Sequence, residues 1–245
     1  MDKELIEKVA AAAPRFVAPR TTEETLTAVW AINLIDNLGL MELWNLILAE
    51  NTSVNLPYHN EQHLLNVVAW CGRLYISDSN GYDRNQFMVL ITSAMIHDIN
   101  HSGGELPDAQ NIQNAFEWFA NALDRITDIG LRTWLKHHYE QVINTVAVTE
   151  FPFIHEPKTS LQKILRDADI LQNFGVHCVK YLAGLKAEFT TAGKPLTNEE
   201  LISRQAEFMK NVVFYTYTGQ SVKQLLGPRV FAEQRDAFLN EKKVN

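Results

Sequence analysis

Apolar residues recur at intervals of three and four along almost the whole chain, whereas the two-residue alternation typical of strands is scarce. This spacing places apolar side chains on one face of a helix and predicts an all-α fold. We expect helices near residues 2–13, 22–37, 41–49, 59–77, 83–97, 108–125, 130–149, 159–190, 197–217 and 229–241.

The expected helix ends carry recognisable signals. A hydroxyl stands three residues before a carboxylate from Thr21 to Glu24 and from Thr197 to Glu200, which is the capping-box pattern of helix starts. Residues typical of helix stops are Gly39, Gly103, Gly104, Pro152, Gly193, Gly227 and Pro228. Because no internal repeat or linker interrupts this order, we expect one compact multi-helix domain over residues 1–245.

Length and charge narrow the class of protein. The chain has 245 residues, of which 46% are apolar, enough for one large core. A net charge of −7 disfavours a nucleic-acid partner. The chain shows no secretory signal and no apolar run of about 20 residues, so we expect a soluble, cytoplasmic protein without a membrane partner. An oligomer is compatible with the sequence but not indicated by it. Cys71 and Cys178 lack the spacing of a thiolate metal site.

The first candidate site lies in the stretch YHNEQHLLNVV, residues 58–68. His59 and His63 are four residues apart and would share the inward face of the expected 59–77 helix. In a zincin peptidase the glutamate of His-Glu-x-x-His is the general base. Here Glu61 would point away from both histidines. Alone, this histidine pair is equally compatible with a structural role.

A second cluster favours a metal site. In LITSAMIHDINHSGG an apolar helix runs directly into His97 and Asp98, and His101 follows one turn later. A carboxylate after such a helix is desolvated, and a metal ion compensates its charge well. Imidazole suits Zn²⁺, and a carboxylate can bridge to a second ion. We therefore expect His97 and Asp98 to bind metal.

A further ligand is expected in the stretch LQKILRDADILQNFG. Asp167 and Asp169 are two residues apart, so they cannot share one helix face. Only one of the two can join the site. Each has apolar neighbours three or four residues away, and periodicity leaves the choice open.

His63, His97-Asp98 and a later aspartate, in this order, resemble the signature of HD-domain metal-dependent phosphohydrolases, an all-helical family. Individual motifs of the sequence are also similar to those of the catalytic domain of class I cyclic nucleotide phosphodiesterases. YHNEQHLLNVV resembles their Tyr-His-Asn-x-x-His, and HDINHSGG resembles their His-Asp-x-x-His-x-Gly. VAVTEFP, DADILQN and RQAEFMKNVVFYTY resemble three later elements of that domain, so the resemblance spans residues 58–217.

The resemblance implies a metal site and a mechanism. It selects Asp169 over Asp167 and implies that His63, His97, Asp98 and Asp169 hold the tighter ion, which is Zn²⁺ by ligand type. Asp98 would bridge to a second ion, Mg²⁺ or Mn²⁺. His59 would be the general acid that protonates the leaving oxygen, and His101 would contact the phosphate or the attacking water.

The resemblance also implies a substrate site. It places the family's glutamine and phenylalanine at Gln205 and Phe208, where the amide would bond a purine edge and the ring would stack on the base. Tyr58 would belong to the same substrate site. Within the expected helix, Gln205 lies in the middle of an apolar stripe, where the alternative is an amide satisfied by the chain itself.

The chain departs from the family in two places. It lacks a clear Leu-Glu-Asn-His-His element, for which PDAQNIQNA is the nearest candidate, with Asp108 or Asn111 in its polar role. Leu171, Gln172 and Asn173 replace the serine and proline that follow the family's aspartate.

Three functions remain open. The first is a cyclic nucleotide phosphodiesterase that yields the 5′-monophosphate. The second is an HD nucleotidase or nucleoside triphosphohydrolase, which would usually add several basic residues. The arginines near the metal-site motifs in sequence are Arg73, Arg84 and Arg166. The third is a non-catalytic metal or nucleotide sensor, which would not need the proton donor His59.

Overall fold

The computed structural model describes residues 21–78, 81 and 83–240, so the expected 2–13 helix lies outside the described residues. The described residues contain helices and no strand. The α-helices are α2 (Thr22–Leu38), α3 (Met41–Glu50), α4 (Glu61–Asp78), α5 (Arg84–Ile96), α6 (Asp108–Leu123), α7 (Ile129–His137), α8 (Tyr139–Val146), α9 (Ser160–Leu171), α10 (Cys178–Thr191), α11 (Asn198–Asn211) and α12 (Tyr217–Leu239). Short 3₁₀ turns are η1 (Thr52–Asn55), η2 (Ala147–Thr149) and η3 (Gln172–Phe174). The expected all-α class is confirmed.

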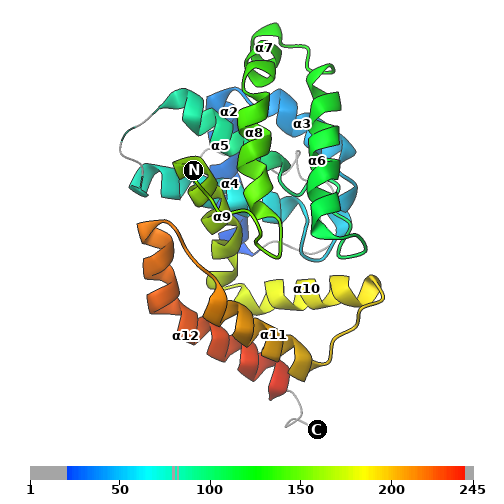
Figure 1. The fold of residues 1–245 in the computed structure, drawn as a ribbon, viewed down its shortest axis with the longest axis vertical. Coiled ribbons are helices and arrows are strands. Elements are labelled where there is room, and N and C mark those ends of the chain that lie inside the picture. The colour runs from blue at the N-terminus through cyan, green and yellow to red at the C-terminus, as the bar shows by residue number, and fades with distance from the viewer. Residues whose placement is uncertain (1–20, 79–80, 82, 241–245) are drawn as a thin grey trace.

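Helix α4 lies at the centre of the fold and packs against α2, α5 and α9 (Figure 1). Its buried residues run from Glu61 to Tyr75 and cover every side of the helix. Helix α5 is equally enclosed, since every residue from Phe87 to Ile96 is buried. A helix that is apolar all round belongs in the interior of a domain. The candidate histidines of α4 and α5 are therefore held on the most enclosed helices of the structure.

Helices α10, α11 and α12 form a second layer below the α2–α9 body (Figure 1). Helix α12 packs against both α10 and α11, and η3 joins α9 to this layer. A small apolar cluster of Leu182, Leu201 and Ile202 holds the layer together. Helix α10 also contacts the first turn of α2, where Lys180 Nζ donates to Oε1 of Glu24 at 2.7 Å.

The signals for helix starts are confirmed in detail. Both expected capping boxes are present, with Thr21 and Glu24 bonded reciprocally in α2 and Thr197 and Glu200 in α11. A third box, at Thr159 before α9, uses a glutamine three residues later. Gly39 ends α2 with φ +77°, a backbone conformation that glycine adopts without steric cost.

Two long expected helices are each divided. The expected 130–149 helix is interrupted at His138, between α7 and α8. The expected 159–190 helix ends at Leu171, and α10 begins only at Cys178 after an extended Gly175. The second break has a consequence for the site, because it turns the chain so that α9 and α10 approach the central helices separately.

The last two expected helices had wrong boundaries. The expected 197–217 helix stops at Asn211, because the backbone N–H groups of Tyr215 and Thr216 donate to the Asp167 carboxylate instead of continuing the helix. The expected stop at Gly227 and Pro228 is also wrong, since α12 continues through Pro228. A proline inside a helix costs roughly 3 kcal/mol, and packing of α12 against α10 and α11 outweighs this penalty.

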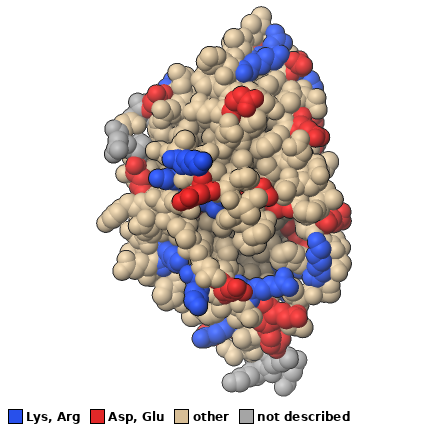
Figure 2. Space-filling view, in the orientation of Figure 1, with Lys and Arg blue, Asp and Glu red and all other residues tan. Residues whose placement is uncertain are grey.

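No helix in the described ranges 21–78 and 83–240 is long and apolar enough to cross a membrane. On the face shown in Figure 2, basic and acidic side chains are interspersed rather than gathered into one basic field. This distribution agrees with the negative net charge of the chain.

Candidate metal centre

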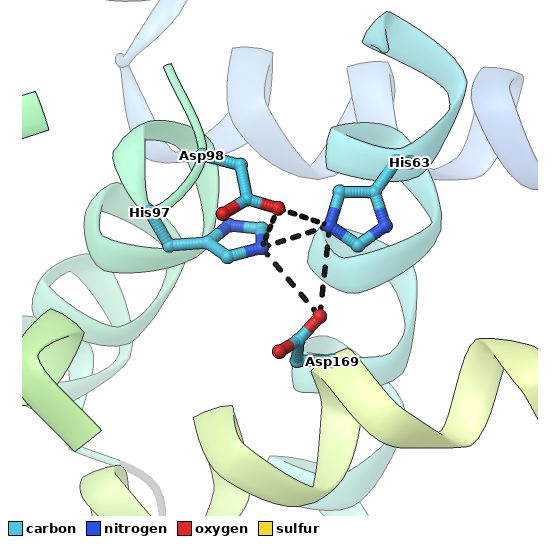
Figure 3. Close-up of side chains that lie close together, drawn as sticks. All are labelled: His63, His97, Asp98 and Asp169. Atoms are coloured by element: carbon cyan, nitrogen blue, oxygen red, sulfur yellow. Dashed lines mark hydrogen bonds and ion pairs between the residues drawn. The ribbon is translucent and has the colours of Figure 1, made fainter. Parts of the chain in front are cut away.

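Four side chains from three parts of the chain converge on one point (Figure 3). His63 comes from α4, His97 and Asp98 follow α5, and Asp169 comes from α9. Nε2 of His63 lies 3.0 Å from Nε2 of His97, 2.7 Å from Oδ2 of Asp98 and 3.5 Å from Oδ1 of Asp169. One donor atom from each residue lies within 4.8 Å of the others. We call these four residues the metal group.

Local structure fixes the orientation of His97. The residue caps the C-terminus of α5 and is 1% exposed. Its Nδ1 lies 2.9 Å from the carbonyl oxygen of Ala94, so the neutral ring donates its proton there and turns the Nε2 lone pair toward the group. Such a backbone contact is the usual support of a metal-binding imidazole.

The electrostatics of the group favour a cation. Burial alone would raise the pKa of Asp98, but the charge of His97 and the hydrogen bond from His63 outweigh it and hold this pKa well below its usual range. Burial lowers the pKa of His97, but the neighbouring carboxylates outweigh it and raise the pKa well above its usual value. Two carboxylates thus require positive charge at this point. A proton on His97 supplies positive charge in the ligand-free protein, and a divalent ion would replace it.

The donor set fits a divalent transition metal. Two imidazole nitrogens and two carboxylate oxygens match the ligands of Zn²⁺ sites. The two imidazoles are buried, whereas the side chains of Asp98 and Asp169 are 13% and 21% exposed. The carboxylates therefore form the solvent side of the group, where water and a substrate can reach it.

The structure separates the two aspartates of α9. Asp169 joins the metal group. Asp167 is fully buried on another side of the helix, where it accepts hydrogen bonds from the backbone N–H groups of Tyr215 and Thr216 and from the Thr216 hydroxyl. It fastens the start of α12 to α9 and takes no part in the group.

His59 lies beside the metal group but outside helix α4, which begins at Glu61 rather than at residue 59. The expectation that His59 and His63 share a helix face is therefore wrong. Their ring centroids are nevertheless 5.7 Å apart. The bend before α4 places His59 next to His63 without making it a fifth member of the group.

A residue that the sequence did not reveal holds His59 in place. Glu188 of α10 is 2% exposed, and its Oε2 lies 2.6 Å from Nδ1 of His59. Its Oε1 accepts the backbone N–H groups of Tyr58 and His59. Gly184 permits this approach, because a Cβ there would lie 2.7 Å from the carbonyl oxygen of Pro57. The only available signal was the four-residue spacing of Gly184 and Glu188, which places both on one face of α10.

His101 stacks on His59 with ring centroids 3.6 Å apart. Its Nδ1 accepts the backbone N–H of Gly103, and its Nε2 faces Asn111 at 3.0 Å and Asp108 at 3.5 Å. Both residues of PDAQNIQNA that were expected to take a polar role thus lie against His101. Burial lowers the pKa of His101, but the hydrogen bond and charge of Asp108 outweigh it and raise the pKa.

His59, His101 and Glu188 also lie close enough to form a second potential metal group. The hydrogen bonds favour another reading. Both oxygens of Glu188 are already used by N–H groups of residues 58 and 59. With its Nδ1 proton held by Glu188, His59 has only Nε2 free to exchange a proton. This pair therefore has the form of an oriented proton donor rather than of a metal site.

No family model matches the sequence, and no curated protein matches it. Solved structures do match. The phosphodiesterase domain of the RhoPDE fusion protein from the choanoflagellate Salpingoeca rosetta is 17% identical, with a TM-score of 0.56 over 97% of each chain. LmjPDEB1, solved in complex with IBMX, is 14% identical, with a TM-score of 0.58 over 100% of this chain and 99% of that one.

The chain has the fold of a phosphodiesterase catalytic domain. The alignments cover 97% and 100% of this chain, so they include both the α2–α9 body and the layer of α10–α12. At these identities the likeness establishes the fold and leaves the chemistry to the residues of the site.

Within the phosphodiesterase fold, the expected substrate residues are dispersed. The Tyr58 hydroxyl is bonded to Gln172 and Asn173 close to the metal group. Gln205 lies on α11 and donates from Nε2 to Gln234 at 3.0 Å. Phe208 packs against the main core and makes an edge contact with Phe151. The chain itself thus satisfies one of the amide's hydrogen-bonding groups at Gln205.

A cavity of about 680 Å³ lies between α11 and α12. Its lining includes Met209, Phe214 and Phe231, but neither Gln205 nor Phe208 nor a member of the metal group. This volume is therefore separate from the residues that could carry chemistry in the phosphodiesterase fold.

Proposed function

We propose that the protein is a metal-dependent phosphohydrolase. The observation that carries this proposal is the position of the metal group directly beside the His59 and Glu188 pair. Hydrolysis of a phosphoester needs a nucleophile, positive charge at the phosphoryl oxygens and a proton for the leaving oxygen. Zn²⁺ at the metal group, with Mg²⁺ or Mn²⁺ shared through Asp98, would act as a Lewis acid and lower the pKa of a water.

The residues of the chain supply the remaining functions. His59 would donate its Nε2 proton to the leaving oxygen, while Glu188 holds the Nδ1 proton and keeps the ring in one orientation. His101, stacked on His59 and held by Asp108, would contact the phosphate or the attacking water. A non-catalytic sensor would have no use for a His59 ring held in one orientation by the buried Glu188.

As substrate we propose a purine 3′,5′-cyclic monophosphate, cleaved to the 5′-monophosphate. Both neighbouring structures are named as phosphodiesterases, and one of them was solved with IBMX. A cyclic phosphodiester carries a single negative charge, which two metal ions neutralise without arginines. The three arginines near the metal-site motifs bind other groups. Arg73 lies over Trp rings, Arg84 binds carbonyl oxygens at the end of α2, and Arg166 binds other carbonyl oxygens.

The test is a panel of substrates at equal concentration with Mn²⁺ or Mg²⁺ added. It compares purine and pyrimidine cyclic monophosphates with linear nucleoside mono- and triphosphates. We expect turnover of a purine cyclic monophosphate, with the 5′-monophosphate as product. Release of phosphate or triphosphate from linear nucleotides, with cyclic ones untouched, would show a nucleotidase or triphosphohydrolase instead.

A further inference from the structure

A chain of three buried side-chain amides ends on the metal group. Gln62 donates from Nε2 to Oδ1 of Asn66 at 2.8 Å, and Asn66 donates from Nδ2 toward Oε1 of Gln172 at 3.4 Å. The amide nitrogen of Gln172 then contacts Nδ1 of His63. All four residues are at most 6% exposed. The orientation of the last amide therefore decides which nitrogen of His63 carries a proton.

With its hydrogen bonds running from Gln62 toward His63, the chain of amides is suited to the metal-free protein. An amide nitrogen is a donor, so Nδ1 of His63 must accept, and the ring proton resides on Nε2. Nε2 lies 2.7 Å from Oδ2 of Asp98 and donates to it. A nitrogen that carries a proton has no lone pair for a metal, so this tautomer cannot bind an ion through Nε2.

The opposite direction is suited to the metal-bound protein. Turning the amide of Gln172 exchanges its oxygen and nitrogen at nearly the same two positions. Its oxygen then accepts the proton of His63 Nδ1, and the Nε2 lone pair of His63 faces the metal group. The Tyr58 hydroxyl, 2.9 Å from the same amide atom, only accepts in the present direction and becomes a donor in the other.

The far end of the amide chain imposes no direction. Oε1 of Gln62 is buried and has no hydrogen-bond partner among the described residues. When the amides turn, the side-chain nitrogen of Gln62 occupies the position of Oε1 and is unpartnered in its turn. One polar atom of Gln62 is therefore unpartnered in either direction. In the middle of the amide chain, the Tyr181 hydroxyl accepts from Nδ2 of Asn66 at 2.8 Å and becomes a donor to Asn66 when the amides turn, in place of its 3.4 Å contact with Glu24. At the other end, the two directions differ where Gln172 meets Tyr58 and His63.

We propose that Gln172 is a positioning residue for metal binding, and that its amide reverses when an ion enters the metal group. The inference rests on the proposed metal site. In the reversed direction Gln172 gives His63 the support that the Ala94 carbonyl gives His97. Because an amide can present either atom, Gln172 stabilises the proton on Nε2 before binding and on Nδ1 afterwards.

The experiment measures Zn²⁺ and Mn²⁺ affinity by competition with a chromophoric chelator, and the tautomer of His63 by ¹⁵N-histidine NMR. The signal of His63 is identified by its loss in His63→Gln. Gln172→Leu removes the acceptor and should weaken metal binding by about 10–100-fold. Gln172→Glu provides a permanent acceptor, so it should retain at least the wild-type affinity and hold the proton on Nδ1 even without metal.

A matched control is Gln234→Leu, which removes a buried amide bonded to the carbonyl oxygen of Cys178 on α10. It should leave both metal affinity and the His63 tautomer unchanged. Wild-type affinity in Gln172→Leu, or an equal loss in Gln172→Glu, would overturn the role of Gln172. So would a His63 tautomer that stays the same when Zn²⁺ binds. Absence of metal binding by the wild-type protein would instead overturn the metal site and the proposed function.

Discussion

Oε2 of Glu188 lies 2.6 Å from Nδ1 of His59, although 129 residues separate them in the chain. The contact crosses between the two layers of the fold, from the bend before α4 to the last turn of α10. It gives the proposed acid a fixed orientation and a nearby negative charge. Burial and the neighbouring His101 lower the pKa of His59, and Glu188 acts in the opposite direction.

The first prediction concerns the pH dependence of turnover. A general acid must be protonated, so activity falls as pH rises through the pKa of His59. Glu188→Gln removes the charge that raises this pKa, and the alkaline limb of the kcat profile should therefore move to lower pH. Metal affinity should stay within about twofold of wild type. An alkaline limb at the wild-type pH would show that Glu188 does not control the proton on His59.

The second prediction separates His59 from His63 by their different functions. His63→Ala should lose metal, because Nε2 of His63 is part of the metal group. His59→Ala should retain metal and lose turnover by ~10²–10⁴-fold, the usual contribution of general acid catalysis. Metal content is measured on dialysed protein, and turnover is measured with the most active nucleotide of the panel. Equal metal loss in both variants would make His59 a ligand.

The third prediction uses the two aspartates of α9 as a matched pair. Asp169→Asn should lower metal binding and remove most activity, because Asp169 belongs to the metal group. Asp167→Asn should leave metal binding unchanged, because its carboxylate binds the backbone at the start of α12. The same substitution two residues away thus controls for the general effect of losing a charge in this helix. The reverse result would mean that Asp167 faces the metal.

Much of this arrangement could be predicted from the sequence because the information is local. Helix periodicity and the capping boxes identified most helices, and the succession of apolar residues before His97 indicated a buried carboxylate at Asp98. Each of these signals depends on residues within about one or two helical turns. Periodicity did not choose between Asp167 and Asp169, and the grouping of Asp169 with His63, His97 and Asp98 came from the resemblance to the HD-domain signature.

Glu188 could not be found in this way. In the stretch KAEFTT it resembles an ordinary exposed charge on a helix, and its burial depends on the break at Gly175 that redirects α10. The predicted helix stop at Pro228 was wrong for a similar reason. Proline opposes a helix locally, whereas the contacts of α12 with α10 and α11 are tertiary. Such outcomes depend on packing between segments that are distant in sequence.

The fourth prediction tests the substrate role of Gln205. If its amide contacts a purine base in both ground and transition states, Gln205→Ala should raise KM by about 10-fold and leave kcat nearly unchanged. Gln205 also bonds Gln234, so Gln234→Leu is the control for loss of that internal contact. Steady-state kinetics on both variants make the comparison. An equal KM in wild type and Gln205→Ala would show that the Gln205 amide does not contact the substrate and bonds only Gln234.

The last prediction concerns Asp167 and the pH dependence of stability. Burial raises the pKa of Asp167 from 3.8 to about 6, because the hydrogen bonds from Thr216 and Tyr215 offset only part of the cost of desolvating the charge. The folded state therefore binds a proton at a higher pH than the unfolded state does. Between pH values of about 6 and 4 the free energy of unfolding should gain roughly 1 kcal/mol for each unit that the pH falls.

Other groups also titrate in this range, so the contribution of Asp167 is isolated by comparison with Asp167→Asn. Urea unfolding of the metal-free proteins at several pH values gives the difference in free energy directly. The variant cannot bind this proton, so it lacks the pH-dependent contribution of Asp167. The free energy of unfolding of wild type minus that of the variant should therefore rise as the pH falls from 6.5 to 4.5. A constant difference would mean that Asp167 has the same pKa in the folded and unfolded chains.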